Sequence, residues 1–379
     1  MRKSIAIIIT SILVLSGCNK QQSVSDRLLN EVEKAIAINP DSASNLLKGI
    51  SSPEKLDNKT FARWCMLSGK ITDEIFNSIL PTYQLERAYD WYSSHGSPDE
   101  QVQILIYLGR SYFADGDYDK AMSIYTNALD IAEKNKLNNL TGYTYSYIGD
   151  LYGEKFMRTE AIKRYKAAAE CFKKENNTDS YACALRDVGR EYACIDSLSR
   201  ALKILTIADS VARNTKNIEV TASIDNALGN IYAMQNKYDK AEEYFLKALV
   251  GRETMPDYMA LIDLYIASGA INKAQELLSK ILQDNPKYTY SIKYLYYQIY
   301  NEEKNYKEAL TNLKEYVEIT DSIIYADNQS KILNIESKYN HLKISKEVDR
   351  LKIKQQSYII VLVICIGILL LIIIGYLLY

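Results

Sequence analysis

Small and large apolar residues recur along this chain with a period of 40 residues. Each copy begins with a glycine, has a tyrosine three residues later, and has alanines 12 and 19 residues after the glycine. The glycines and first alanines of four consecutive copies are Gly109, Gly149, Gly189, Gly229, Ala121, Ala161, Ala201 and Ala241. A fixed period of this length is typical of stacked helical units, whose backbones approach closely only where side chains are small. The sequence therefore predicts an all-α solenoid.

One copy of the pattern predicts how its two helices pack. Gly109 on the first helix and Ala121 on the second are expected to form the close contact. Tyr112 and Tyr125 would fill the wider gaps beside it. Gly116 lies in the predicted turn, where a glycine adopts a positive φ without steric cost.

The apolar pattern also divides the rest of the chain. Residues 26–61 are predicted to form an N-terminal helical cap, and residues 62–323 an array of about six to seven repeats. Residues 324–357 form a charged stretch without helix breakers, with apolar residues at three- and four-residue spacing. This stretch is either a dimerising coiled-coil stalk that transmits motion, which predicts a homodimer, or a helix that caps the last repeat.

The two ends of the chain are strongly apolar. Residues 1–17 have a basic start and a short apolar run, which is typical of a signal peptide. Residues 358–379 contain no charged residue and are long enough to predict one transmembrane helix. Together they predict a protein of the inner membrane, with the repeats facing the periplasm and a single C-terminal span. The basic residues before the span oppose this orientation by the positive-inside tendency, but the signal peptide outweighs them.

Composition excludes several classes of function. The net charge is −1, so no basic field predicts a nucleic-acid partner. The two histidines have no metal-like spacing to other ligands, and no catalytic or phosphate-binding motif occurs. We therefore expect no enzyme, no catalytic residue, no metal and no cofactor. Cys171 and Cys183 lie near a repeat boundary and are either a disulfide or two small buried thiols.

The repeat residues resemble a known family. Leu108-Gly109, Tyr112, Gly116-Asp117-Tyr118 and Ala121 are similar to the tetratricopeptide repeat (TPR). The resemblance implies helix–turn–helix units stacked in a right-handed superhelix, with the first helix of each unit lining a concave side. The expected architecture is thus a TPR superhelical solenoid, followed by a long helical stalk and one transmembrane helix.

The resemblance implies a ligand groove. Residues three before and one after each repeat glycine are expected to face the concave side, among them Ile106 and Ser146. The polar residues predicted to contact a peptide or protein ligand are Arg110, Asp150, Arg186, Arg190, Asn226 and Asn230. The alternative is that these residues are solvated surface.

Two further resemblances concern the ends. Leu15-Ser16-Gly17-Cys18 resembles the lipobox of bacterial lipoproteins, which implies lipidation of Cys18 and a lipidated linker over residues 18–25; the alternative is a plain signal peptide. Pro40-Asp41-Ser42-Ala43 and the stretch from Ile335 through Leu351 resemble bacterial membrane-anchored TPR regulators, here without a cytoplasmic output domain. This implies a sensor that relays ligand binding to a regulatory partner. The alternative is a passive periplasmic scaffold.

Overall fold

The computed structural model describes residues 25–75, 79–281, 289–325, 350–351 and 353–358. Its contacts divide the chain into two units, Met1–Val317 and Glu318–Tyr379. The regular structure in the described residues is helical, without a strand. The prediction of an all-α, TPR-like helical solenoid is confirmed for the first unit.

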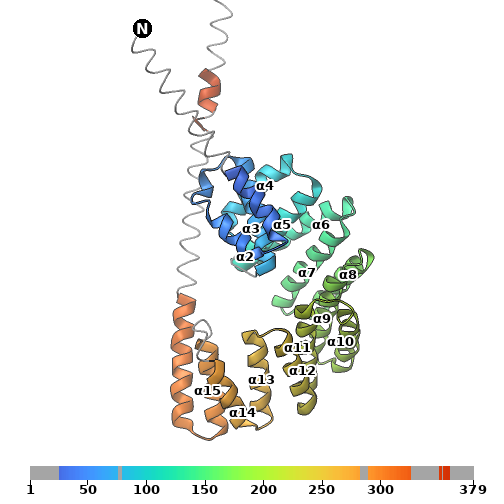
Figure 1. Ribbon diagram of the computed structural model, residues 1–379, viewed down its shortest axis with the longest axis vertical. Coiled ribbons are helices and arrows are strands. Elements are labelled where there is room, and N and C mark those ends of the chain that lie inside the picture. The colour runs from blue at the N-terminus through green and yellow to red at the C-terminus, as the bar shows by residue number, and fades with distance from the viewer. Residues whose placement is uncertain (1–24, 76–78, 282–288, 326–349, 352, 359–379) are drawn as a thin grey trace, which may run out of the picture. The chain divides into compact units, whose positions relative to one another are not determined.

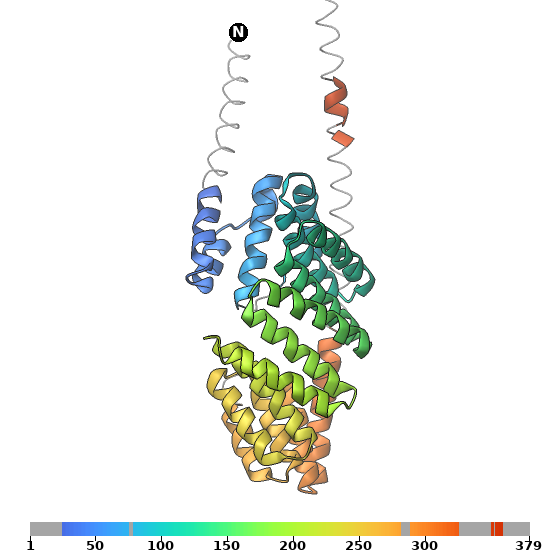
Figure 2. The same ribbon diagram turned by 90° about the vertical axis from the view of Figure 1, so that its right-hand side faces the viewer.

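Consecutive helices of the first unit lie side by side in antiparallel pairs (Figures 1 and 2). The unit opens with a helix over residues 25–36, followed by α2 (Pro40–Lys48), the short 3-10 helix η1 (Pro53–Lys55), α3 (Asn58–Ile75) and α4 (Thr82–His95). The regular pairs are α5 (Pro98–Ala114) with α6 (Tyr118–Lys134), α7 (Asn138–Glu154) with α8 (Arg158–Lys174), α9 (Thr178–Cys194) with α10 (Leu198–Ala212), and α11 (Ile218–Met234) with α12 (Tyr238–Gly251). The unit continues with α13 (Met255–Ala267), α14 (Ile271–Ile281), α15 (Thr289–Glu302) and a helix that starts at residue 306.

The turn between the two helices of a pair has the same left-handed conformation in successive repeats. Gly116 has a φ of +77°, which confirms the prediction for this residue. The residues 40, 80 and 120 positions later are Phe156, Asp196 and Asn236, with φ values of 58°, 56° and 58°. The turn geometry is therefore kept where the glycine is absent.

Each repeat glycine makes room for a large side chain of the second helix. A Cβ atom added to Gly149 would lie 2.7 Å from the Tyr165 ring, and one added to Gly229 would lie 2.7 Å from the Phe245 ring. Tyr125 and Leu205 occupy the same place beside Gly109 and Gly189. The sequence predicts that each repeat glycine contacts the first repeat alanine of the second helix. The atoms nearest to its missing side chain instead belong to the residue 16 positions later. The alanines Ala121, Ala161, Ala201 and Ala241 are fully buried.

The stacking of successive pairs is uneven at one junction. First helices of neighbouring pairs contact each other between α3 and α5, α5 and α7, α9 and α11, and α11 and α13. Contact between α7 and α9 is weaker than at any of these, and α9 packs instead against α8 and its own partner α10. The buried apolar core is also interrupted at this junction. A small cluster around Ala161, Tyr165 and Val188 lies there between two larger clusters. The structure therefore leaves space between α7 and α9.

The prediction of a C-terminal membrane span is wrong for the part of the chain that the structure places. No helix there combines the length and the apolar character needed to cross a bilayer. The physical reason is that these helices are amphipathic; α6, for example, buries Ala121, Tyr125 and Ala128 and carries charged residues on its other face. The prediction of a single span in the inner membrane is therefore wrong for the described residues, and so is the localisation that was inferred from it. Residues 359–379 of the predicted span lie outside the described residues.

The other predictions for the chain ends stay untested. Residues 1–24, which include the predicted signal peptide and Cys18, lie outside the described residues. Of the predicted stalk, only residues 324–325, 350–351 and 353–357 are described, and they are helical. The coiled coil and the homodimer therefore stay predictions.

Candidate binding pocket

A cavity of about 660 Å³ occupies the space between α7 and α9. We call it the α7–α9 pocket. It brings together four of the residues that the sequence predicted to face the groove, Ser146 and Asp150 from α7 with Arg186 and Arg190 from α9. The other residues that line it are Phe113, Gly153, Glu154, Phe156, Arg158, Tyr165, Asp187, Glu191 and Cys194.

Two arginines of the pocket are already neutralised by acidic neighbours. The Arg186 guanidinium donates to both carboxylate oxygens of Asp187, at 2.9 Å and 3.1 Å, and to the Ser223 hydroxyl at 3.0 Å. Arg158 donates to both carboxylate oxygens of Glu191 at 3.3 Å. Glu191 itself is buried. The charges of both arginines are thus balanced by a carboxylate of the chain.

Asp150 has no such neutralising partner at hydrogen-bond distance. Its carboxylate accepts a hydrogen bond of 2.6 Å from the Tyr165 hydroxyl. Solvent reaches its side chain, but the pocket walls displace much of the surrounding water. This desolvation raises the pKa of Asp150 to about 6, against the effect of the Tyr165 hydrogen bond, which stabilises the ionised form.

Arg190 differs from the other two arginines of the pocket in having no ion-pair partner among the described residues. Its side chain is exposed, and it makes no hydrogen bond or ion pair with any described residue. It lies one helical turn from the Arg186–Asp187 pair on the same helix. Its five N–H donors are therefore available to an anionic group.

The remaining predicted groove residues lie elsewhere. Arg110 forms an ion pair with Asp73, lies 5.5 Å from the Tyr147 ring centroid, and lines a separate cavity of about 170 Å³ that it shares with Asp150. Asn226 donates to Asp257 at 2.9 Å, and Asn230 donates to Asn226 at 3.0 Å. Ile106 is buried, with 5% of its surface exposed, so it packs in the core and does not face a groove.

Sequence reasoning missed the rim of the pocket. Phe156 is 79% exposed, and the Arg158 guanidinium carbon lies 5.0 Å from its ring centroid. The adjacent Met157 is also exposed. The 40-residue period could have pointed to this rim, because Phe156 occupies the turn position that Gly116 has in the preceding repeat. The equivalent turn residues of the other three regular repeats are Gly116, Asp196 and Asn236, so an apolar ring marks this turn as different from the others.

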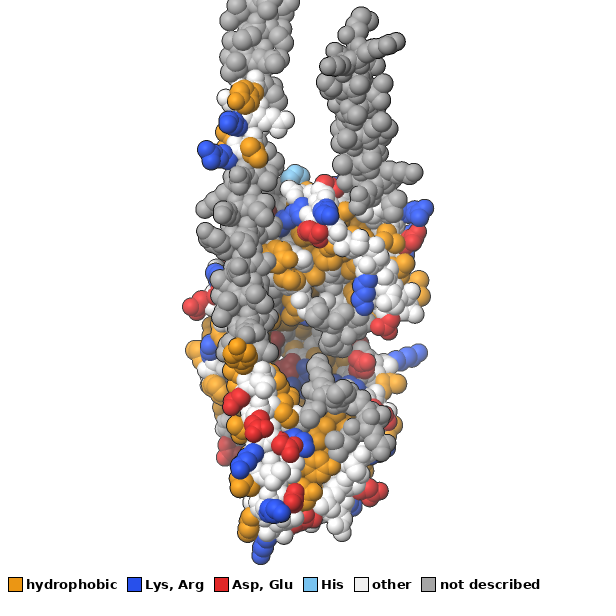
Figure 3. Space-filling view, turned by 90° about the vertical axis from the view of Figure 1, so that its left-hand side faces the viewer, with side chains coloured by type: hydrophobic (Ala, Val, Ile, Leu, Met, Phe, Trp, Pro, Cys, Tyr) orange, Lys and Arg blue, Asp and Glu red, His pale blue; other side chains and the backbone are white. Residues whose placement is uncertain are grey.

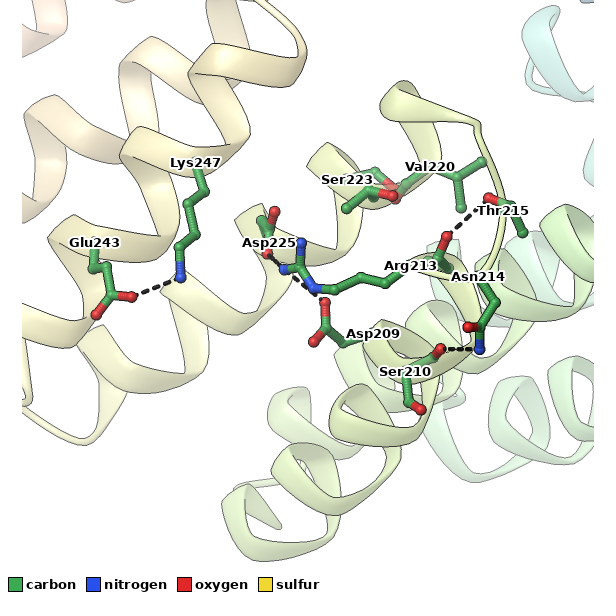
Figure 4. Close-up of polar contacts among 12 residues, drawn as sticks. Asp209, Ser210, Arg213, Asn214, Thr215, Val220, Ser223, Asp225, Glu243 and Lys247 are labelled. Atoms are coloured by element: carbon green, nitrogen blue, oxygen red, sulfur yellow. Dashed lines mark hydrogen bonds and ion pairs between the residues drawn. The ribbon is translucent and has the colours of Figure 1, made fainter.

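A second cavity, of about 680 Å³, lies beside α11 and α12. Arg213 there pairs with Asp209 at 2.8 Å and with the buried Asp225 at 2.7 Å, and Lys247 pairs with Glu243 at 2.6 Å (Figure 4). Its Arg213, Lys247 and Glu243 groups are thus engaged with partners in the chain. The α7–α9 pocket is the better candidate for a binding site, because Asp150 and Arg190 form no ion pair with any described residue.

Charge and thiol chemistry add no further site. Lys, Arg, Asp and Glu side chains are interspersed on the face seen in Figure 3, in keeping with the net charge of −1. Within the described ranges, no group of three or more His, Cys, Asp and Glu residues is arranged to hold a metal ion. Cys171 and Cys183 are free thiols, so the disulfide that the sequence left open does not form here.

Two segments of the chain match models of one repeat family. Residues 100–174 and 221–255 each match a model described as Tetratricopeptide repeat. The chain carries tetratricopeptide repeats. No curated protein matches the sequence.

Solved structures share the TPR-like fold at low sequence identity. A Rap protein complexed with Competence and Sporulation Factor is 18% identical with a TM-score of 0.61, and the match covers 80% of this chain and 88% of that one. NprR in complex with its cognate peptide NprX is 15% identical with a TM-score of 0.50, covering 82% and 97%. Aspartyl phosphate phosphatase F from Bacillus subtilis is 15% identical with a TM-score of 0.54, covering 73% and 75%. At these identities the similarity establishes the fold alone.

Proposed function

We propose that this protein is a non-catalytic interaction module that binds a peptide or a segment of a protein in the α7–α9 pocket. The observation that carries the proposal is the convergence of Ser146, Asp150, Arg186 and Arg190 on one cavity of about 660 Å³. Pockets of this size, formed mainly before the ligand arrives, are typical binding sites. Two proteins of similar fold have been solved as complexes, NprR with its cognate peptide NprX and the Rap protein with Competence and Sporulation Factor.

Site-specific cross-linking in cells tests the proposal. A photoreactive amino acid at position 190 lies in the pocket, and one at position 226 lies on the next first helix. We expect position 190 to capture a specific protein or peptide that mass spectrometry identifies. Capture should be weaker from position 226, because this position does not line the α7–α9 pocket.

The matched control is position 203 on α10, where Lys203 is exposed and lies outside the pocket. The same product captured from position 203 would mean non-specific contact. If position 190 yields no product that position 203 lacks, the pocket is not a binding site in the cell.

We also propose that occupancy of the pocket is relayed to a regulatory protein partner, as the resemblance to TPR regulators implies. The test is affinity purification of the chain with the cross-linked ligand present or absent. The proposal requires a co-purifying protein whose amount depends on the ligand. A constant set of partners would instead favour a passive scaffold.

For the N-terminus we propose lipidation of Cys18, on the basis of the lipobox-like run that precedes it. Metabolic labelling with an alkyne fatty acid should mark the wild-type chain, and the Cys18→Ser variant should lose the label. Equal labelling of both proteins would contradict the proposal.

A further inference from the structure

The α7–α9 pocket contains an acidic and a basic group that form no ion pair with any residue the structure describes. Arg158 and Arg186 are paired with Glu191 and Asp187, as described above. Arg190 has no hydrogen-bond or ion-pair partner among the described residues. Among the described residues, Asp150 accepts a side-chain hydrogen bond from the neutral Tyr165 hydroxyl and forms no ion pair. Arg186 and Arg190 act on its charge only at longer range. The pocket therefore presents to an occupant one carboxylate and one guanidinium that have no ion-pair partner among the described residues.

A second carboxylate, that of Glu154, lies on the α7 side of the pocket. Glu154 is exposed at the edge of the pocket and accepts a 3.5 Å hydrogen bond from the Tyr118 hydroxyl. It follows Asp150 by one helical turn on α7, so both carboxylates lie on the same face of that helix. The α7 wall is thus acidic, and the α9 wall carries the unpaired Arg190.

We propose that the occupant of the pocket is a peptide segment with both signs of charge, which presents a lysine, an arginine or its amino terminus to Asp150 and a carboxylate to Arg190. This inference rests on the proposed function and adds the chemistry of the ligand. A ligand with only one charge would leave one of the two groups in the pocket desolvated and unpaired, which lowers affinity. A wholly apolar ligand would leave both unpaired.

The proposal predicts a dependence of binding on pH. The charged and titratable groups that act on Asp150 are Tyr165 from α8 and Arg186, Asp187 and Arg190 from α9. Arg110 from α5, Tyr125 from α6 and Tyr147 from its own helix line the smaller cavity that Asp150 also faces. Desolvation within this set raises the pKa of Asp150 to about 6. Below that pH the carboxyl is protonated in the free protein and no longer attracts a cation. Affinity for a basic ligand should therefore fall by up to about tenfold between pH 7.5 and pH 5.

Selection from a phage-displayed library of random dodecapeptides, with the full chain as the target at pH 7.5, tests the proposal. We expect enrichment of peptides that carry at least one basic and one acidic residue. Asp150→Asn should lose the preference for the basic residue, and Arg190→Gln the preference for the acidic one. The pH dependence of the selected peptides should disappear in Asp150→Asn.

Matched controls are Asp130→Asn on α6 and Arg200→Gln on α10, two exposed residues outside the pocket. Both should select the same peptides as the wild-type chain, and circular dichroism verifies that all four variants fold. Peptides enriched without any charge preference, or unchanged preferences in both pocket variants, overturn this inference and leave the proposed function in place. Failure to enrich any peptide, together with no cross-linking from position 190, overturns both.

Discussion

At the residue scale, the tightest constraint lies where a repeat glycine faces a large side chain. Gly229 is in the middle of α11, where an alanine would favour the helix by about 1 kcal/mol. The missing Cβ position, however, lies 2.7 Å from the Phe245 ring, which is itself buried. The contact between the two helices therefore depends on the absence of a single carbon atom.

We expect Gly229→Ala to lower the free energy of unfolding by about 1–2 kcal/mol, because the steric cost of overpacking exceeds the gain in helix propensity. Urea denaturation followed by circular dichroism measures the change. The control is Gly153→Ala in α7, where the nearest atom to the new Cβ is a Glu191 carboxylate oxygen at 3.4 Å, an ordinary contact. That variant should be neutral or slightly stabilised. Equal destabilisation of both would show that the Phe245 contact is not the cause.

The left-handed turn of α7–α8 provides a second test at this scale. Phe156 has a φ of 58°, a conformation that costs a non-glycine residue about 1 kcal/mol and that asparagine tolerates better. We expect Phe156→Asn to raise the free energy of unfolding by about 1 kcal/mol, measured by thermal or urea denaturation.

Asp196 offers the matched reverse change, since it occupies the same turn position with a φ of 56° and is exposed. Asp196→Phe should destabilise the protein by a similar amount. If Phe156→Asn is instead less stable than the wild type, the ring of Phe156 contributes packing that outweighs the backbone strain.

At the element scale, one buried carboxylate joins α12 to α13 and α11. The Asp257 side chain is fully buried and accepts two hydrogen bonds of 3.0 Å from Arg252, which lies just after α12. It also accepts hydrogen bonds from Thr254 and, at 2.9 Å, from Asn226 on α11. This network explains why Asn226, predicted to face a ligand, acts as a structural residue.

We expect Arg252→Ala to destabilise the protein by about 3 kcal/mol, because it leaves the buried Asp257 carboxylate without its cation. The measurement is urea denaturation at neutral pH. Lys203→Ala on the exposed face of α10 is the control and should change the stability by less than about 0.5 kcal/mol. A loss as small as that of the control would mean that the hydrogen bonds from Asn226 and Thr254 alone suffice.

At the scale of the whole molecule, contacts in the first unit are between helices close in sequence, as in other repeat arrays. The core is correspondingly divided into clusters that each span a few consecutive helices. Damage to one repeat should therefore affect its neighbours more than distant repeats.

Ala161→Arg tests this locality, because Ala161 is fully buried at the start of α8. The unpaired charge and lost packing should cost about 3–5 kcal/mol. Hydrogen–deuterium exchange should show the largest loss of protection in α7, α8 and α9, with α13 and α14 least affected. The exposed Lys163→Arg is the control and should leave the exchange pattern unchanged. Uniform loss of protection along the array would contradict local coupling.

The sequence by itself determined the helical pairs, their order and the positions of the small residues at the helix contacts. The spacing of Gly109, Gly149, Gly189 and Gly229 sufficed for this, because close helix contacts need small residues at fixed intervals. It also predicted that Asp150 and Arg190 lie on the equivalent face of successive first helices, because each directly follows a repeat glycine. The same local reasoning predicted a membrane span, which no helix in the described residues provides.

Only the tertiary structure decided where the array opens. A strict period of 40 residues predicts equal junctions, yet α9 packs against α8 and α10 with little contact to α7, and the pocket lies beside α7. The structure also decided that Arg158 is neutralised, because its partner Glu191 is 33 positions away. Arg186 is neutralised by the adjacent Asp187, and its bond to the Ser223 hydroxyl, 37 positions away, is likewise a tertiary contact. Sequence periodicity fixes contacts within a repeat, whereas the tilt between repeats and the pairing of charges across them depend on how all the side chains at a junction pack together.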